Sequence, residues 1–327
     1  MITEWVSWPW VFYINIPIAL LVLAATPGLM PGARTQRGAV DIPGAIAVTA
    51  GLALAVFGIV RAPEEGWGST STILVLAGAA VLLIAFVAIQ SARSAPLVRL
   101  GIFRTPNLGG ANLAQLLLGA AWIPMWFFLN LYLQQVLGFG AFEGGSALLP
   151  MTVAIMVLMI LVAPRVINRL GFKTPIVAGL LLLAAGLVGL SFARPDGNFA
   201  ADVLPASLIA ATGMALAFIP SLGTAISSAR PEEGGLASGI VNTSYQVGSA
   251  LGLAAMTALA TAHGAGQLGN PQALTDGFSA AFLGAAGIAV AGALVALVPL
   301  RQPPQARSPE PAEPIEAPVG EPAVGAR

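Results

Sequence analysis

Long stretches without any charged residue constrain this chain more than any other feature of its sequence. Nine runs of roughly 20 residues or more contain no Asp, Glu, Lys or Arg, and about 20 apolar residues cross a bilayer as one helix. The runs are 5–33, 42–60, 66–92, 105–142, 144–164, 174–193, 203–229, 234–275 and 277–300. Only 9% of the residues are charged, against about 25% in a soluble domain. The sequence therefore predicts an all-α polytopic protein with nine transmembrane helices, surrounded by lipid.

Two of these runs are long enough to raise the question of a second helix. Run 105–142 is apolar from about residue 108 to residue 139, and we interpret it as one long helix kinked at Pro124. Run 234–275 loses its apolar character after Ala262. The motifs Gly235-x-x-x-Gly239 and Gly248-x-x-x-Gly252 within it predict close packing against a neighbouring helix.

The positions of the basic residues predict the orientation of the chain. All 14 Lys and Arg residues except Arg61 and Arg194 follow an odd-numbered span, and cytoplasmic loops are the ones rich in these residues. We therefore expect the N-terminus outside and the C-terminus in the cytoplasm of a cell that holds the protein in its inner membrane. The Pro-rich tail 301–327 lacks large apolar residues and is expected to be disordered and cytoplasmic.

The composition argues against several functional classes. Basic and acidic residues number 14 each, so no basic stripe for nucleic acid is expected. The chain has no Cys and one His, and none of the nine apolar runs contains an Asp, Glu, Lys or Arg that could form an acidic metal site or a proton relay. We therefore expect no cofactor, no metal site and no enzyme activity.

Uncharged polar side chains form stripes on two of the predicted helices. At about 100° per residue, the polar residues of each stripe fall within roughly 100° of helix surface. Such stripes suit a cavity for a large, mostly apolar ligand; the alternative is interhelical hydrogen bonding, worth about 0.6 kcal/mol per bond. The candidate cavity residues are Asn112, Gln115, Trp126, Asn130 and Gln134 on the first helix, and Asn242 and Gln246 on the second.

The first span carries aromatic residues with Asn and Pro, and later segments carry Asp-Ile-Pro-Gly, Gly-Trp and Tyr-Leu-Gln. Together these motifs resemble the fourteen-helix drug:proton antiporters of the major facilitator superfamily. The first span carries Trp8, Trp10, Phe12, Asn15 and Pro17, in a run similar to the sixth helix of that family, although Pro9 replaces an Arg of the pattern. The segments 41–44 (Asp-Ile-Pro-Gly) and 66–67 (Gly-Trp) resemble the signatures of its two-helix insert. The segment 132–138, which begins Tyr-Leu-Gln, resembles a further motif of the family.

A degenerate form of the superfamily's basic loop follows the fifth span. Arg169, Gly171 and Lys173 match the pattern, whereas Asn168 and Phe172 are substituted. The resemblance implies a cytoplasmic gating loop formed by Arg165, Asn168, Arg169, Gly171 and Lys173. Asn168 stands where the family has an Asp, which puts a gating salt bridge in doubt. The alternative is that the three cations anchor the topology.

The resemblance implies a domain organisation and a function. Residues 1–32 would be the last helix of an otherwise missing N-terminal six-helix bundle, 33–105 the inserted two-helix linker, and 106–300 the C-terminal six-helix bundle. The implied function is proton-coupled efflux of amphipathic drugs or small molecules; the alternative is a non-transporting membrane scaffold or accessory subunit. A missing N-terminal half would be a further partner. We expect the chain by itself to insert into the membrane without driving export.

Overall fold

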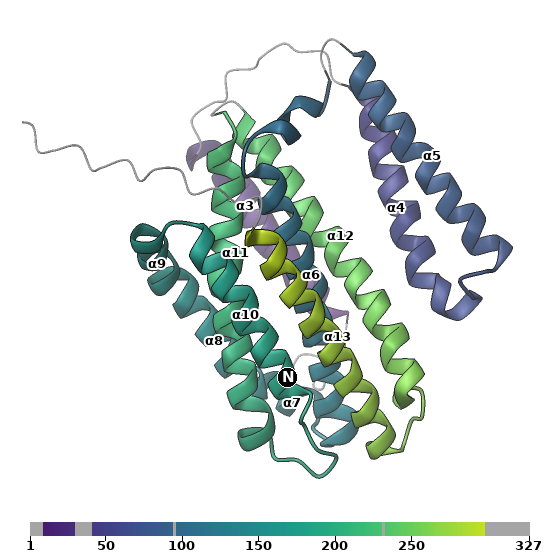
Figure 1. Cartoon of the computed structure of the whole chain (residues 1–327), viewed down its shortest axis with the longest axis vertical. Helices are drawn as coiled ribbons and strands as arrows, with labels where there is room; N and C mark the ends of the chain where they lie inside the picture. The colour runs from purple at the N-terminus through teal and green to yellow at the C-terminus, as the bar shows by residue number, and fades with distance from the viewer. Residues whose placement is uncertain (1–8, 30–40, 94–95, 231–232, 298–327) are drawn as a thin grey trace, which may run out of the picture.

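The computed structural model describes residues 9–29, 41–93, 96–230 and 233–297. Trp8 and the predicted tail lie outside these residues. Within them, every regular element is helical, and eight helices are long and apolar enough to cross a membrane (Figure 1). The predicted all-α membrane fold is confirmed, whereas the orientation of the chain stays a prediction.

The eight long helices correspond to eight of the nine predicted spans. They are α4 (Ile42–Glu65), α5 (Thr70–Ala92), α6 (Leu108–Leu131), the consecutive segments α7 (Ala141–Ala147), α8 (Leu149–Val157) and α9 (Ala163–Leu170), α10 (Lys173–Leu190), α11 (Leu204–Ser228), α12 (Gly234–Ala260) and α13 (Pro271–Leu297). The first predicted span contains α2 (Trp10–Tyr13) and α3 (Asn15–Leu29), whose apolar part, Asn15–Thr26, is shorter than the other spans.

The two long runs each form one membrane helix, as predicted. Helix α6 continues through a π-helical turn at Tyr132–Val136, so that a single apolar helix extends over 29 residues with Pro124 inside it. Helix α12 ends in a similar turn at Thr261–Ala265, where the apolar run ends.

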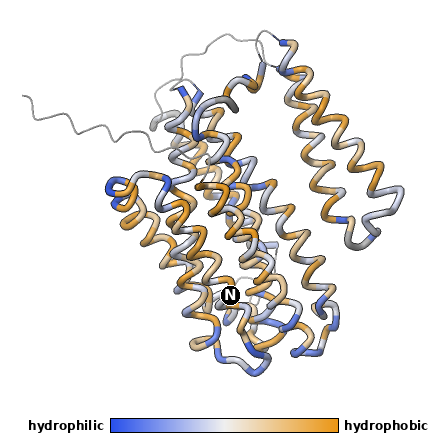
Figure 2. Tube along the Cα trace, viewed as in Figure 1, coloured by the Kyte–Doolittle hydropathy of each residue, from blue (hydrophilic) through white to orange (hydrophobic). Residues whose placement is uncertain are grey.

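Several helices extend beyond the charge-free runs of the sequence, so that charged residues lie near their ends. Arg61 lies in α4, Arg165 and Arg169 lie in α9, and Asp276 lies in α13. A helix continues as long as its backbone hydrogen bonds can form, so it extends past the apolar run into the headgroup region. Figure 2 accordingly shows hydrophilic residues gathered at the two ends of the molecule and hydrophobic ones between them.

The helices form a bundle with a separate hairpin beside it. The closest packing joins α10 to α11 and α13, and α6 to α12 and α13. The segment α7–α9 packs mainly on α11. Helices α4 and α5 pack on each other, and α4 touches the bundle along α12 (Figure 1).

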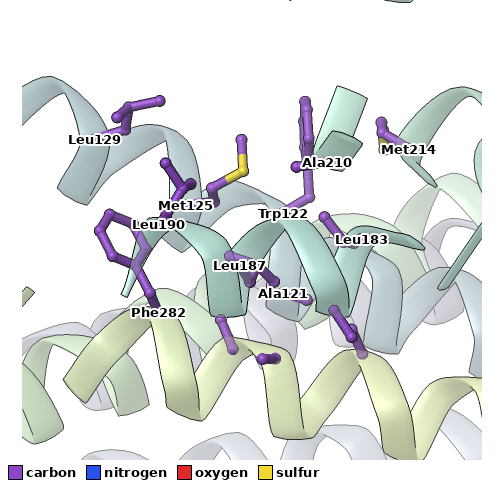
Figure 3. Close-up of a cluster of buried hydrophobic side chains, with 14 of the residues drawn as sticks. Ala121, Trp122, Met125, Leu129, Leu183, Leu187, Leu190, Ala210, Met214 and Phe282 are labelled. Carbon is purple, nitrogen blue, oxygen red and sulfur yellow. The ribbon is translucent and has the colours of Figure 1, made fainter. Parts of the chain in front are cut away.

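The bundle core is filled by side chains from several helices. Trp122 and Met125 of α6, Leu187 of α10 and Phe282 of α13 are each at most 5% exposed and lie in one cluster (Figure 3). Between membrane helices the hydrophobic effect contributes little, because lipid tails are as apolar as Leu. The core is therefore stabilised mainly by close van der Waals packing.

Small residues allow that packing, but only one of the two predicted glycine motifs takes part. A Cβ on Gly248 would lie 2.7 Å from the backbone carbonyl carbon of Leu116, and one on Gly252 would lie 2.6 Å from that of Ala120. This motif therefore presses α12 against α6, as predicted. Gly235 and Gly239 have no described atom within 4 Å of a Cβ position, so the prediction is wrong for that motif within the described residues.

Candidate functional site

A groove of about 540 Å³ separates α12 from α4. Its lining residues are Leu52, Ala53 and Val56 from α4, and Asn242, Thr243, Gln246, Val247 and Ala250 from α12. Two predicted cavity residues, Asn242 and Gln246, thus lie one turn apart on its polar wall, and both are exposed. Since lipid tails offer no partner for an amide, this wall suits a ligand that is mostly apolar and carries a few polar atoms.

The candidate residues at the beginning of α6 lie between helices rather than in this groove. The Asn112 side chain donates to the Leu108 carbonyl at 2.9 Å and accepts from the Ser244 hydroxyl of α12 at 3.1 Å. The Gln115 Nε2 donates to the Phe218 carbonyl of α11 at 3.2 Å. The bonds to Ser244 and to Phe218 join different helices, as the alternative interpretation expects.

The remaining oxygen of Gln115 differs from these contacts. Gln115 is 1% exposed, and its Oε1 has no hydrogen-bond partner among the described residues. Leaving a buried acceptor unpaired costs about 1–3 kcal/mol. A water or a polar ligand atom that reached this oxygen would recover part of that cost.

The other three candidates on α6 lie toward its C-terminal end. Trp126 is partly buried and packs edge-on against Trp122, with ring centroids 6.2 Å apart. The Gln134 amide is exposed and donates to the Asn130 side chain. The structure therefore divides the predicted cavity residues into three groups: the groove pair on α12, the buried pair at the beginning of α6, and these three.

The predicted gating residues are mostly helical. Arg165, Asn168 and Arg169 lie in α9, and Gly171, with φ of +71°, caps its C-terminal end. Lys173 begins α10, and its Nζ donates to the Leu297 carbonyl at the end of α13 at 2.5 Å. That contact places a cation at the negative end of a helix dipole, so Lys173 helps to hold two neighbouring helices of the bundle together.

The motif residues of the first span lie on an exposed segment. Trp10 is 53% exposed and packs edge-on against Tyr13, with centroids 5.8 Å apart. Phe12 is 63% exposed, and the Asn15 side chain donates to the Phe12 carbonyl at 3.3 Å. Asn15 and Pro17 are also exposed. None of these residues is among those that line the groove.

A buried polar network at the start of α4 involves a residue that sequence reasoning missed. The Asp41 carboxylate accepts from Gly44 N at 3.0 Å and from Gln90 Nε2 at 2.7 Å, and Arg93 Nη1 lies 3.3 Å from it. Gln90 in turn accepts from Val98 N at 3.0 Å. The motif predicted the importance of Asp41, but no local spacing indicates Gln90, which is 49 residues away.

A second polar network lies at the opposite end of the bundle. The Tyr132 hydroxyl donates to the Arg194 carbonyl at 2.6 Å, and the Arg194 guanidinium lies 3.2 Å from Asp202. A Cβ on Gly197 would lie 2.8 Å from that hydroxyl. The Tyr-Leu-Gln motif thus contributes a tyrosine that fastens α6 to the connection between α10 and α11.

Comparison with known proteins relates most of the chain to one family. The family described as Major Facilitator Superfamily matches residues 1–253. The Cephamycin export protein CmcT of Amycolatopsis lactamdurans is 35% identical over 313 residues, which cover 94% of this chain and 63% of that protein.

Two further curated relatives are similar over nearly as much of the chain. The Puromycin resistance protein pur8 of Streptomyces alboniger is 31% identical, covering 91% of this chain and 61% of that protein. The Lincomycin resistance protein of Streptomyces lincolnensis is 31% identical, covering 92% of this chain and 62% of that protein. The chain thus spans somewhat more than three-fifths of the length of these relatives.

Proposed function

Because this chain belongs to the major facilitator superfamily, we propose that it serves the proton-coupled export of amphipathic antibiotics or similar small molecules. It is a multi-pass membrane protein, and we place it in the cell membrane, since export from a cell requires that location. The observation that carries the proposal is the similarity to proteins named for cephamycin export and for puromycin and lincomycin resistance.

The substrate class follows from the groove between α4 and α12. The α12 wall carries the amides of Asn242 and Gln246, and α4 contributes Leu52 and Val56. None of the described residues that line the groove is an Asp, Glu, Lys or Arg. An uncharged wall of this kind binds ligands through apolar contact and a few hydrogen bonds. We assign Trp126, Asn130 and Gln134 to a second region of substrate contact.

The domain assignment follows the packing of the helices. We propose that α4 and α5 are the inserted pair and that α6 to α13 form the C-terminal six-span bundle. In this arrangement the groove lies between the insert and the bundle, so the insert would contribute one wall of the substrate path.

Disruption of the coding sequence in the organism that carries it tests the proposal. We expect the disrupted strain to accumulate more of at least one of puromycin, lincomycin and a cephamycin than the parent does, as measured by mass spectrometry of washed cells. A protonophore should raise accumulation in the parent strain to the level of the disrupted strain, because export would then lose its driving force. Unchanged accumulation of all three compounds would overturn the proposal and favour a non-transporting scaffold.

Variants in the same genomic setting test the groove. The double variant Asn242→Leu, Gln246→Leu should restore export of fewer compounds than the parent sequence, with equal protein in the membrane. Gln272→Leu removes an exposed amide outside the groove and should restore export fully. Asn130→Leu or Gln134→Leu should likewise change which compounds are exported; a loss of protein from the membrane instead would mean that these residues serve packing.

A further inference from the structure

Two adjoining pockets lie where α11 ends and α12 begins, away from the groove. Their volumes are about 310 and 340 Å³. Both are lined by Arg99, Arg230 and Glu233. Thr105 and Ser228 add hydroxyl groups to one pocket, while Leu97 and Leu236 add apolar surface to the other.

The backbone on both sides of Arg99 is anchored, while its side chain is 68% exposed. It precedes a short 3-10 helix, η1 (Leu100–Arg104), in the connection between α5 and α6. On one side, Val98 N donates to Gln90 of α5 at 3.0 Å. On the other side, Ile102 is 3% exposed and packs with Ala225 of α11 and Val241 of α12. The backbone that carries Arg99 is therefore fixed before any ligand arrives.

The charges of the pockets are only partly paired. Arg99 Nη1 lies 3.5 Å from Glu233 Oε1, which is longer than the roughly 2.7–2.9 Å of a strong charge-assisted hydrogen bond. None of the ion pairs found among the described residues includes Arg230. Among the described lining residues, two guanidinium groups therefore stand against one carboxylate, and guanidinium is the side chain best suited to bind phosphate.

The surroundings of the pockets indicate where such a phosphate would come from. Ser228 is the last residue of α11, and Glu233 directly precedes α12. Arg230 therefore lies between the ends of two membrane helices, and Arg99 lies beside them through its contact with Glu233. Leu97, which is 44% exposed, presents apolar surface beside them. Charged groups next to apolar surface at a helix end match the boundary between lipid headgroups and acyl chains.

We propose that Arg99 and Arg230 bind the phosphate of a phospholipid headgroup at this boundary. The phosphate lies between the two guanidinium groups, and the first part of an acyl chain lies along Leu97 and Leu236. Glu233 competes with the phosphate for Arg99. This site is independent of the proposed export function.

Lipid retention by the purified full-length chain tests the proposal. The chain is titrated in detergent with phosphatidylglycerol, or with a diacylglycerol that has the same acyl chains, and bound lipid is counted by native mass spectrometry. We expect retention of phosphatidylglycerol and not of the diacylglycerol. Arg99→Gln and Arg230→Gln should each weaken retention by about fivefold, the effect expected for one basic residue near an anionic lipid.

Two further variants separate this site from a general effect of charge or folding. Arg169→Gln removes an exposed cation on α9 and should leave retention unchanged. Glu233→Gln frees Arg99 and should strengthen retention, a result that loss of structure would not produce. Equal retention by the parent and by the double arginine variant, or equal retention of the two lipids, would overturn the proposal. Displacement of the lipid by an equal concentration of inorganic phosphate would assign the pockets to free phosphate instead.

Discussion

At the scale of single residues, Asp41 shows how one carboxylate can organise the end of a membrane helix. Its side chain is almost fully buried and receives hydrogen bonds from Gly44 and Gln90. Burial raises the pKa of Asp41, but the bonds from Gly44 and Gln90 and the charge of Arg93 outweigh burial, so its pKa lies below the usual value. The charged carboxylate is therefore part of the folded structure.

This pKa shift predicts a pH-dependent contribution to stability. Because the folded pKa lies below the unfolded value of about 3.9, the contribution is complete above that pH and is lost as the pH falls through the folded pKa. We expect Asp41→Asn to lower the melting temperature at pH 7, and the gap from the parent to shrink in acid. Thermal unfolding in detergent, followed by tryptophan fluorescence, measures this gap. As a control, Asp196→Asn changes an exposed carboxylate and should have the same melting temperature as the parent at each pH. A difference between Asp41→Asn and the parent that stays constant into strong acid would contradict the prediction.

At the scale of elements, α12 has two faces with different roles. Gly248 and Gly252 bring it against α6, while Asn242 and Gln246 line the groove toward α4. Glycine is a poor helix former, and at positions 248 and 252 its cost is offset by the close approach of two backbones. The packing face therefore holds the polar face in a fixed orientation.

Alanine substitutions on α12 test the packing face. We expect Gly248→Ala and Gly252→Ala each to destabilise the bundle by about 1–3 kcal/mol, because an added methyl group would press on the α6 backbone. Gly239→Ala is the matched control: its Cβ position is open, so it should be neutral or stabilise by about 0.5–1 kcal/mol through helix propensity. Denaturant unfolding in detergent compares the three variants. Equal changes in the free energy of unfolding of all three variants would show that helix propensity alone determines these changes.

At the scale of the whole molecule, hydrophilic residues lie at both ends and apolar residues between them (Figure 2). Arg99, Arg165 and Arg169 follow odd-numbered predicted spans along the chain, whereas Asp196 follows an even-numbered one. The positive-inside rule therefore predicts that the three arginines face the cytoplasm and that Asp196 faces outside.

Labelling of introduced cysteines tests this orientation, because the chain has no native Cys. Asn168→Cys and Asp196→Cys each replace an exposed residue. In intact cells, an impermeant thiol reagent should label the variant at position 196 at once, and the variant at position 168 only after permeabilisation. Leu268→Cys, at a residue 78% exposed between α12 and α13, should behave like the variant at position 196. The reverse pattern would show that the orientation is inverted.

The extent to which the site could be predicted differs from residue to residue. The spacing of Asn242 and Gln246 on one helix face was sufficient to indicate that they lie together. The same reasoning applied to Asn112 and Gln115 did not reveal that both bond to neighbouring helices. Leu52 and Val56 could not have been selected at all, because an apolar residue in an apolar helix carries no signal of the groove that it lines.

The sequence by itself determined where the eight long apolar helices lie along the chain, although not where each one ends. Bilayer thickness sets the length of an apolar run, and in lipid a helix satisfies its own backbone hydrogen bonds, so local composition is sufficient. The tertiary structure alone decided which amides are buried, that Gln90 meets Asp41, and that Arg99 comes beside Arg230. These outcomes depend on how helices distant in sequence are rotated and placed against one another, and side-chain packing between helices sets that rotation.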